Sequence, residues 1–189
     1  MTLIVTDTIS LELISEIHAV PVFDLVAENR QHLRQWLPWV DNMRTIHNFH
    51  HYIQNTKKEI AAGRQLSYII IVEGNVAGRS GVYNINKQLG TASLGYWLSE
   101  AYEGKGIITK VCKKLIDFSF FELQLDEVEI RCATNNLKSE AIAKRLNFNW
   151  QFVIKQGEFI NKRFIDLNVY KLTKTEWELT IQENFTGTK

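Results

Sequence analysis

A glycine-spaced basic loop stands between an apolar stretch and an amphipathic one, and its residue types suit the binding of phosphate. Gly104 and Gly106 allow the backbone to approach a ligand closely because they carry no Cβ, and Lys105 adds a cation between them. The N–H groups of the helical turn that should follow point outward at the positive end of a helix dipole. The residues predicted to bind phosphate are Gly104, Lys105, Gly106, Ile107, Ile108 and Thr109.

Gly104-Lys-Gly106 fits neither of the two common nucleotide-binding loops. A dinucleotide fingerprint needs three glycines early in a parallel strand–helix–strand series and an acidic residue about 20 positions later. A P-loop needs Gly-Lys followed by Ser or Thr, which this loop lacks. The three antiparallel strands expected before the loop also disagree with both folds. Taken alone, the loop is equally compatible with an ordinary helix start.

Asn136 and Ser139 lie three apart at the expected start of the next helix, where both side chains can face the same side. Both residue types also favour N-cap positions, so capping is an equally weighted interpretation of Asn136. With this pair, the sequence resembles the GCN5-related N-acetyltransferase (GNAT) superfamily along nearly its whole length. Residues 102–109 resemble its pyrophosphate loop, and Asn136-x-x-Ser139 ahead of Leu146-x-Phe148 resembles its second acetyl-CoA motif.

Four further segments are similar to the ribosomal-protein-serine acetyltransferase branch of that superfamily. They are Leu94-Gly-Tyr-Trp-Leu98, Leu11-Glu-Leu13, Trp36-x-x-Trp39 and Gly157-x-x-x-Asn161. The resemblance implies acetyl-CoA as co-substrate and acetyl transfer by direct attack of a primary amine, with the N-terminal α-amine of a ribosomal protein as the leading acceptor. Two alternatives stay open: acetylation of a small amine, and a catalytically silent acyl-CoA-binding module.

The resemblance also implies roles for individual residues. The strand segment Gly95–Leu98, with Tyr96, Trp97 and Leu98, would carry a bulge, splay from its neighbour and pair its free backbone groups with the pantetheine amides. Ser139 would protonate the departing thiolate, and Glu100 would act as the base through water. An ordinary exposed glutamate is the competing interpretation of Glu100. Among the aromatic residues near the N-terminus, Trp36 and Trp39 are the candidates for the wall of the substrate groove, although such rings are more often core.

Two residues depart from the superfamily pattern in the loop. Glu103 stands where Gln or Arg is usual, and its carboxylate would repel a pyrophosphate unless the side chain points away. Ile108 stands where Gly or Ala is usual, so its side chain must adopt a helical rotamer that leaves its N–H clear. Both departures bear on cofactor binding rather than on the fold.

The elements that would position these residues predict a mixed α/β domain, and the resemblance implies a GNAT fold of about seven strands and four or five helices. The hydrophobic pattern predicts a helix at 19–36 that breaks near Asn29 and ends before Pro38, and further helices at 45–62, 107–121 and 137–146. It predicts strands at 11–14, 66–72, 76–85, 92–98, 128–133, 148–154 and 164–172, the last two joined across Gly157 and Asn161-Lys162. Residues 1–189 are expected to be a single domain with a polar C-terminal tail at 173–189.

Composition narrows the class of protein. Lys and Arg number 22 against 21 Asp and Glu, so bulk charge does not predict nucleic-acid binding. Cys112 and Cys132 lie in apolar periodic segments and are expected to be buried thiols in a reducing compartment. No signal peptide or apolar run of membrane-spanning length is seen, so we expect a cytoplasmic protein. The resemblance and the apolar N-terminal helices predict a homodimer. The cluster His47, His50 and His51 lacks partners to complete a zinc site, so no metal is expected.

Overall fold

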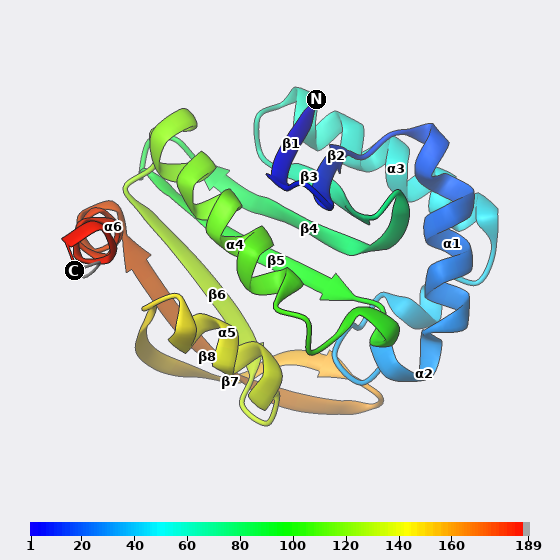
Figure 1. Cartoon of the computed structure of the whole chain (residues 1–189). Coiled ribbons are helices and arrows are strands. Elements are labelled where there is room, and N and C mark those ends of the chain that lie inside the picture. The colour runs from blue at the N-terminus through cyan, green and yellow to red at the C-terminus, as the bar shows by residue number, and fades with distance from the viewer. Residues whose placement is uncertain (187–189) are drawn as a thin grey trace.

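The computed structural model describes residues 1–186, which form one eight-stranded mixed sheet with helices on both faces (Figure 1). The strand order is β1-β2-β3-β4-β5-β6-β8-β7. The strands are β1 (Thr2–Thr6), β2 (Ile9–Leu13), β3 (Leu66–Val72), β4 (Asn75–Asn86), β5 (Thr91–Leu98), β6 (Glu127–Ala133), β7 (Asn149–Ile160) and β8 (Arg163–Thr173). The helices are α1 (Ala19–Glu28), α2 (Arg30–Leu33), α3 (Ile46–Ala61), α4 (Ile107–Asp117), α5 (Leu137–Arg145) and α6 (Lys174–Thr186).

The predicted elements are confirmed in order and type, with differences at the two ends of the chain. The expected helix break at Asn29 separates α1 from α2. The sheet has one strand more than the expected seven because Thr2–Thr6 pairs with β2 as an edge strand. Residues 174–186 form α6 where a polar tail was expected. Thr173 and Glu176 cap this helix, and Trp177 beneath them is only 2% exposed.

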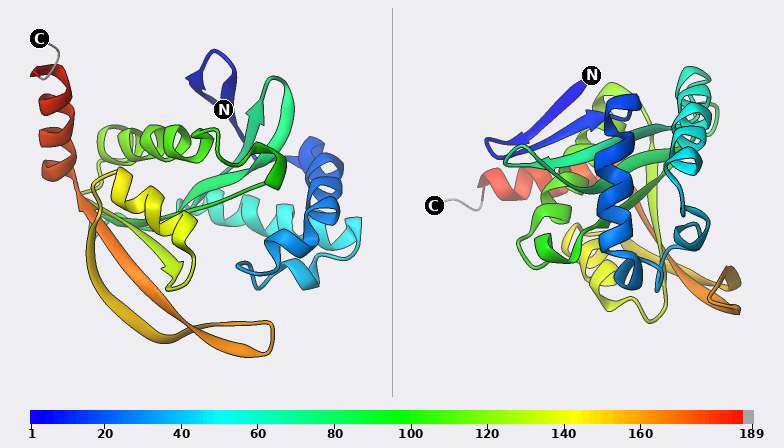
Figure 2. Two further views of the ribbon diagram at one scale, coloured as in Figure 1. Left: turned by 60° about the horizontal axis from the view of Figure 1, so that its bottom comes forward. Right: turned by 90° about the vertical axis from the view of Figure 1, so that its right-hand side faces the viewer.

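Each face of the sheet packs on its own group of helices (Figure 2, left). Alternation along a strand sends successive side chains to opposite faces. On β5, Leu98 joins the larger core under α4, whereas Trp97 joins a second core with α1 and α3. On β3, Ile70 likewise belongs to the larger core and Ile69 to the second core. The molecule therefore has two apolar layers, and the glycine loop before α4 belongs to only one of them.

The sheet opens between β5 and β6. These parallel strands pair only from Thr91↔Glu127 to Leu94↔Ile130, whereas β6 continues to pair with β8 as far as Ala133. The second half of β5, residues 95–98, pairs only with β4. The expected splay is therefore present. The bulge expected within that segment was wrong, because its register with β4 runs without a shift and the irregularity lies further back in β4, at residues 83–86.

Candidate functional site

The loop before α4 presents unused backbone N–H groups. Gly104 and Gly106 have φ values of 73° and 71°, the left-handed region that favours glycine, and an added Cβ at either would meet nothing within 4 Å. Lys110 donates the first N–H bond of the helix, to the carbonyl of Gly106 at 3.2 Å. Among the described residues, the N–H groups of residues 107–109 find no acceptor, while the side chains of Ile107 and Ile108 are buried in the core beneath. The loop can therefore offer several donors to an anion.

Glu103 is turned away from these amides and toward the side chains of His32 and Lys138. Its carboxylate lies 3.0 Å from Nε2 of His32 and also accepts from Nζ of Lys138. This hydrogen bond and the charge of Glu103 raise the pKa of Lys138 above its ordinary value. Because α2 and α5 supply the partners, the acidic residue in the loop joins two helices and loses much of its repulsion toward a phosphate.

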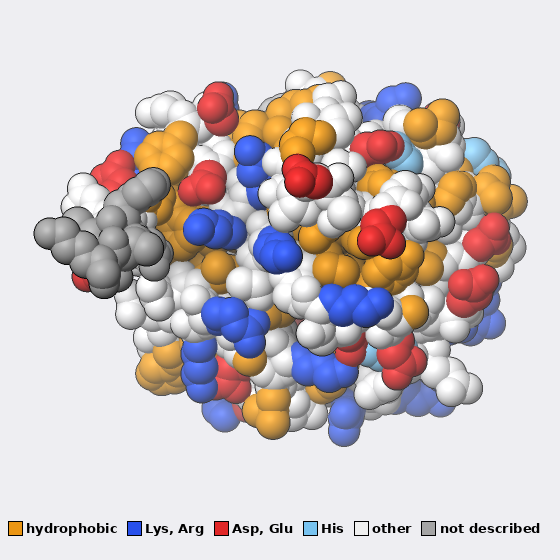
Figure 3. Space-filling model, in the orientation of Figure 1, with side chains coloured by type: hydrophobic (Ala, Val, Ile, Leu, Met, Phe, Trp, Pro, Cys, Tyr) orange, Lys and Arg blue, Asp and Glu red, His pale blue; other side chains and the backbone are white. Residues whose placement is uncertain are grey.

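Basic side chains on α5 lie beside the loop, and the sequence analysis missed them. Arg145 donates from Nη1 to Oγ1 of Thr109 at 2.9 Å. Lys138 and Arg145 are seven residues apart, so they share one face of α5. This two-turn spacing is a signal that the sequence could have supplied. Figure 3 shows Lys and Arg side chains gathered over α4 and α5 on the face that carries the loop. Lys105, by contrast, lies over the ring of Tyr102, 5.4 Å from its centre.

Ser139 and Tyr96 meet across the opening in the sheet. The Tyr96 hydroxyl on β5 lies 2.8 Å from Oγ of Ser139 on α5. Asn136 caps the helix, since its Oδ1 accepts the backbone N–H of Ser139 at 3.1 Å, so the capping interpretation of Asn136 is confirmed. The hydroxyl of Ser139 takes no part in that cap and remains available for chemistry.

Burial keeps the protons on the groups at this junction. Desolvation is the main cause that raises the pKa of Tyr96, helped by the nearby Cys112 and opposed by the bond to Ser139. Desolvation also raises the pKa of Cys132 to about 11. Tyr96 and Ser139 are thus a pair of O–H donors at neutral pH. As expected, both cysteines are buried and free.

Glu100 lies just past the end of β5, in the single 3₁₀ turn Glu100–Tyr102. Its backbone N–H donates to Oδ1 of Asn29 at 3.1 Å, and its side chain is exposed. The structure therefore places it beyond the open end of the strand, without direct contact to Ser139 among the hydrogen bonds of the described residues. A role for Glu100 as a base needs an intervening water.

Aromatic rings gather on the opposite face of the open strand. Trp39 lies 6.1 Å from Trp97, ring centre to ring centre. The indole Nε1 of Trp97 is buried and has no hydrogen-bond partner among the described residues. Trp36 is half-buried in the turn after α2 and does not join this ring pair. Of the two expected groove residues, the structure brings only Trp39 to the ring of Trp97.

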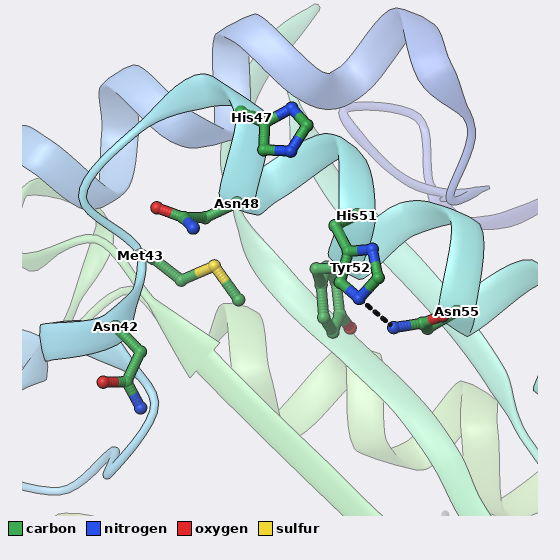
Figure 4. Close-up of a pocket in the computed structure, with 7 residues that line it drawn as sticks. All are labelled: Asn42, Met43, His47, Asn48, His51, Tyr52 and Asn55. Atoms are coloured by element: carbon green, nitrogen blue, oxygen red, sulfur yellow. Dashed lines mark hydrogen bonds between the residues drawn. The ribbon is translucent and has the colours of Figure 1, made fainter.

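A pocket of about 520 Å³ lies beside this aromatic group, between α3 and the turn before it (Figure 4). Its lining residues are Asn42, Met43, His47, Asn48, His51, Tyr52 and Asn55. His51 bonds to Asn55 at 3.0 Å, and His50 faces away to pair with Glu16. Across residues 1–186, no three His, Cys, Asp or Glu side chains gather as a metal site, and no helix is long and apolar enough to cross a membrane.

The tip of the β7–β8 hairpin reaches the helices on this face. Nδ2 of Asn161 donates to the carbonyl of Arg34 at 3.0 Å. Asn161 and Lys162 form the turn, with φ values of 50° and 63°, whereas Gly157 lies inside β7 and not in the turn as expected. The hairpin therefore contacts the same segment, 30–45, that carries Trp39 and part of the pocket.

Known proteins share both the sequence and this architecture. The family model described as the acetyltransferase (GNAT) domain matches residues 9–149. The chain is 31% identical over 175 residues to "Putative ribosomal N-acetyltransferase YdaF" of Bacillus subtilis, covering 92% of this chain and 96% of that protein. It is 28% identical over 169 residues to the ribosomal-protein-serine acetyltransferase of Escherichia coli, covering 89% and 94%.

Two solved structures add ligands to the comparison. RimL, a ribosomal L7/L12 α-N-protein acetyltransferase in complex with coenzyme A, superposes with a TM-score of 0.90 at 25% identity, covering 93% of this chain and 99% of that one. The microcin C7 self-immunity acetyltransferase MccE, in complex with acetyl-CoA and AMP, superposes with a TM-score of 0.85 at 25% identity, covering 89% and 94%.

Proposed function

The chain belongs to the acetyltransferase family that has the GNAT domain, and from this premise we propose that it acetylates the α-amine at the N-terminus of a protein, with ribosomal proteins the leading class. It is an acetyl-CoA-dependent N-acetyltransferase, as its named relatives and ligand-bound structural neighbours are. The names of the two curated relatives, both ribosomal acetyltransferases, support the choice of acceptor.

The observation that carries the proposal is the opening of the sheet beside a loop of free amides. Bound acetyl-CoA supplies the thioester whose acetyl group is transferred. We assign its pyrophosphate to the N–H groups of residues 104–109, where the left-handed glycines leave open space. Its pantetheine amides would pair with the backbone of Tyr96, Trp97 and Leu98, which β6 leaves free. The amide N–H2 of Asn136, for which the described residues show no acceptor, would donate to the same ligand.

Acetyl transfer requires more than one proton transfer, and we assign these to different side chains around the opening of the sheet. The acceptor amine must lose a proton before it attacks, and Glu100 would accept that proton through water. As the new N–C bond forms and the C–S bond breaks, the departing sulfur needs a proton. Ser139 would donate that proton while its Oγ stays hydrogen-bonded to the Tyr96 hydroxyl at 2.8 Å, and the second proton lost by the acceptor nitrogen as it becomes an amide would restore the hydroxyl of Ser139. These residue roles are part of the proposal.

A small amine is the second candidate acceptor. MccE, a structural neighbour of similar coverage, is described in complex with AMP, so this fold also accommodates a nucleotide-sized group. A panel assay separates the candidates: release of CoA thiol is measured with N-terminal peptides, amino acids, polyamines and aminoglycosides. We expect turnover with peptides, and turnover confined to small amines would overturn the N-terminal proposal.

Mass spectrometry of N-terminal acetylation in cells with and without the protein tests the acceptor directly. Loss of acetylation from one or a few N-termini is the expected result. Calorimetry with CoA and acetyl-CoA tests the cofactor separately. Binding without thiol release on any acceptor would favour a silent acyl-CoA-binding module.

We also propose a homodimer in the cytoplasm, with one domain spanning the chain. Four aromatic side chains of the β7–β8 hairpin are more than half exposed: Trp150, Phe152, Phe159 and Phe164. β7 is the edge strand of the sheet, and exposed apolar side chains on it and beside it are suited to a partner surface. Light scattering coupled to size exclusion measures the mass of the unmodified protein and of the variants Phe159→Ser and Phe164→Ser. We expect a dimer that the substitutions weaken, and a monomeric mass for the unmodified protein would refute the proposal.

A further inference from the structure

Arg79 is a half-buried cation without an anionic partner. Its guanidinium lies over the ring of Tyr52, 4.8 Å from the centre, and over the ring of Trp39 at 5.6 Å. Among the described residues, it forms no ion pair and no hydrogen bond through its side chain. Aromatic faces stabilise and orient a guanidinium but leave its N–H groups unsatisfied. A partly desolvated charge of this kind gains from an external anion.

The position of Arg79 connects it to the reaction. It is the cross-strand partner of Trp97, so the two residues lie about 5 Å apart on neighbouring strands and share a face. That face is the one opposite α4. Arg79 therefore lies one strand from the segment assigned to pantetheine, on the side away from the pyrophosphate loop. The indole N–H of Trp97 is also buried and has no acceptor in the part of the chain that the structure describes, so it is a second unpaired donor on that face.

Positive charge extends outward from this point along the segment 30–45. A second pocket, of about 390 Å³, is lined by Arg30, Arg34, Asp41 and Arg44. Asp41 pairs with Arg34 at 2.9 Å, which leaves two guanidiniums without a carboxylate in that lining. The whole chain carries a net charge of only +1, so this excess is local. This local positive charge would attract an anionic acceptor toward the face of the sheet that carries Arg79.

The two pockets lie on either side of one short turn. Residues 42–43 line the larger pocket and residues 41 and 44 the smaller one. Arg30 holds this turn by donating to the carbonyls of Val40 and Met43 at 2.5 and 2.6 Å. Tyr52 links Arg79 to the larger pocket, because its ring contacts the guanidinium and also lines that pocket (Figure 4). The asparagine amides there can bond to an extended polypeptide.

We propose that Arg79 binds a carboxylate side chain of the acceptor, so that the preferred substrate is an N-terminal segment with Asp or Glu at its second or third residue. The inference rests on the proposed function and adds the acidic character of the substrate. An extended chain advances about 3.5 Å per residue, which brings the carboxylate of an early residue to Arg79 when the α-amine is at the opening of the sheet.

Peptides that differ only at residues two and three test the inference. The kcat/KM is measured for an acidic peptide, its Asn or Gln counterpart and a Lys counterpart. We expect the acidic peptide to exceed its amide counterpart by roughly 10- to 100-fold, the range of a hydrogen bond to a charged group. Arg79→Gln should reduce this ratio to about 2 or less, and Arg79→Lys should retain part of it. Arg64→Gln, a matched loss of one charge at an exposed site, should leave the ratio unchanged.

The outcomes separate the inference from the function on which it rests. Equal rates for acidic and neutral peptides would overturn the acidic preference and leave N-terminal acetylation standing. A preference that persists in Arg79→Gln would assign the preference to another group and overturn the role of Arg79. Failure of every peptide would refute the proposed function itself. CoA affinity and circular dichroism establish that each variant is folded, and if Arg79→Gln does not fold, the ratios in Arg79→Lys and the unmodified protein decide.

Discussion

Replacement of Ser139 by alanine should slow acetyl transfer far more than it weakens CoA binding. The change removes Oγ, which lies 2.8 Å from the Tyr96 hydroxyl. It preserves the helix cap, because Asn136 accepts from the backbone N–H of residue 139, which alanine also carries. The variant therefore tests the hydroxyl without disturbing the start of α5.

The size of the effect follows from what remains at the junction. Loss of a general acid costs typically 10²- to 10⁴-fold in rate. Burial raises the pKa of Tyr96, so its phenol stays protonated and can partly replace the missing donor. We therefore expect a loss near the lower end, about 10²-fold in kcat. Tyr96→Phe alone should cost less, and the double variant should fall short of the product of the two single effects because the groups act together.

Thiol release under saturating acetyl-CoA gives kcat, and calorimetry gives the Kd for CoA. We expect the Kd to change by less than about threefold, since the hydroxyl bonds to Tyr96 rather than to the loop amides. Ser10→Ala, on the far strand β2, is the matched control and should behave as the unmodified protein. An unchanged kcat in Ser139→Ala would refute the proton-donor assignment and leave this residue only its place in the first turn of α5.

Three further changes probe the loop and the buried phenols. Gly106→Ala forces a Cβ into a φ of 71°, so CoA affinity should fall by about 1–2 kcal/mol; equal affinity by calorimetry would contradict the need for a left-handed residue. Glu103→Gln removes the anion that engages Lys138, so CoA should bind more tightly at low ionic strength, with the gain lost in high salt; weaker binding would mean that the ion pair is needed to order the loop. Burial raises the pKa of Tyr68 and of Tyr170 to about 12, whereas unfolded phenols titrate near 10, so the folded protein binds more protons and its stability should fall as pH rises above about 10. Ultraviolet absorbance of phenolate, recorded while the protein unfolds at rising pH, follows the titration of these side chains. Titration of Tyr68 and Tyr170 near pH 10 in the folded protein would disprove the prediction.

Local residue chemistry predicted much of the fold and the loop. The left-handed glycines before α4 and the helix break at Asn29 depend on neighbours in sequence, so the sequence was sufficient. The capping pair Thr173 and Glu176 is also a local signal for the start of α6. The first strand was missed because a five-residue edge strand carries too little periodicity to identify.

Contacts between distant segments could not be predicted in this way. Glu103 was expected only to point away, and nothing local indicates that its partners are His32 before it and Lys138 after it. Nothing in the sequence around Arg79 predicts a binding role, because its contacts with Trp39 and Tyr52 form only in the folded chain. The hydroxyl pair of Tyr96 and Ser139 likewise exists only because the sheet opens between the elements that carry them.

The opening between β5 and β6 also affects the stability of the protein and its resistance to proteolysis. Within residues 1–186, only four pairs of strand partners, at 91–94 and 127–130, join the β1–β5 half of the sheet to the β6–β8 half. A ligand that bonds to the free part of β5 and to the helix start binds the folded chain alone, and at 100 times its Kd it adds about 2.7 kcal/mol of stability. Resistance to proteolysis would then rise and fall with the supply of acetyl-CoA. The abundance of the enzyme, and not only its rate, would follow the metabolic state of the cell.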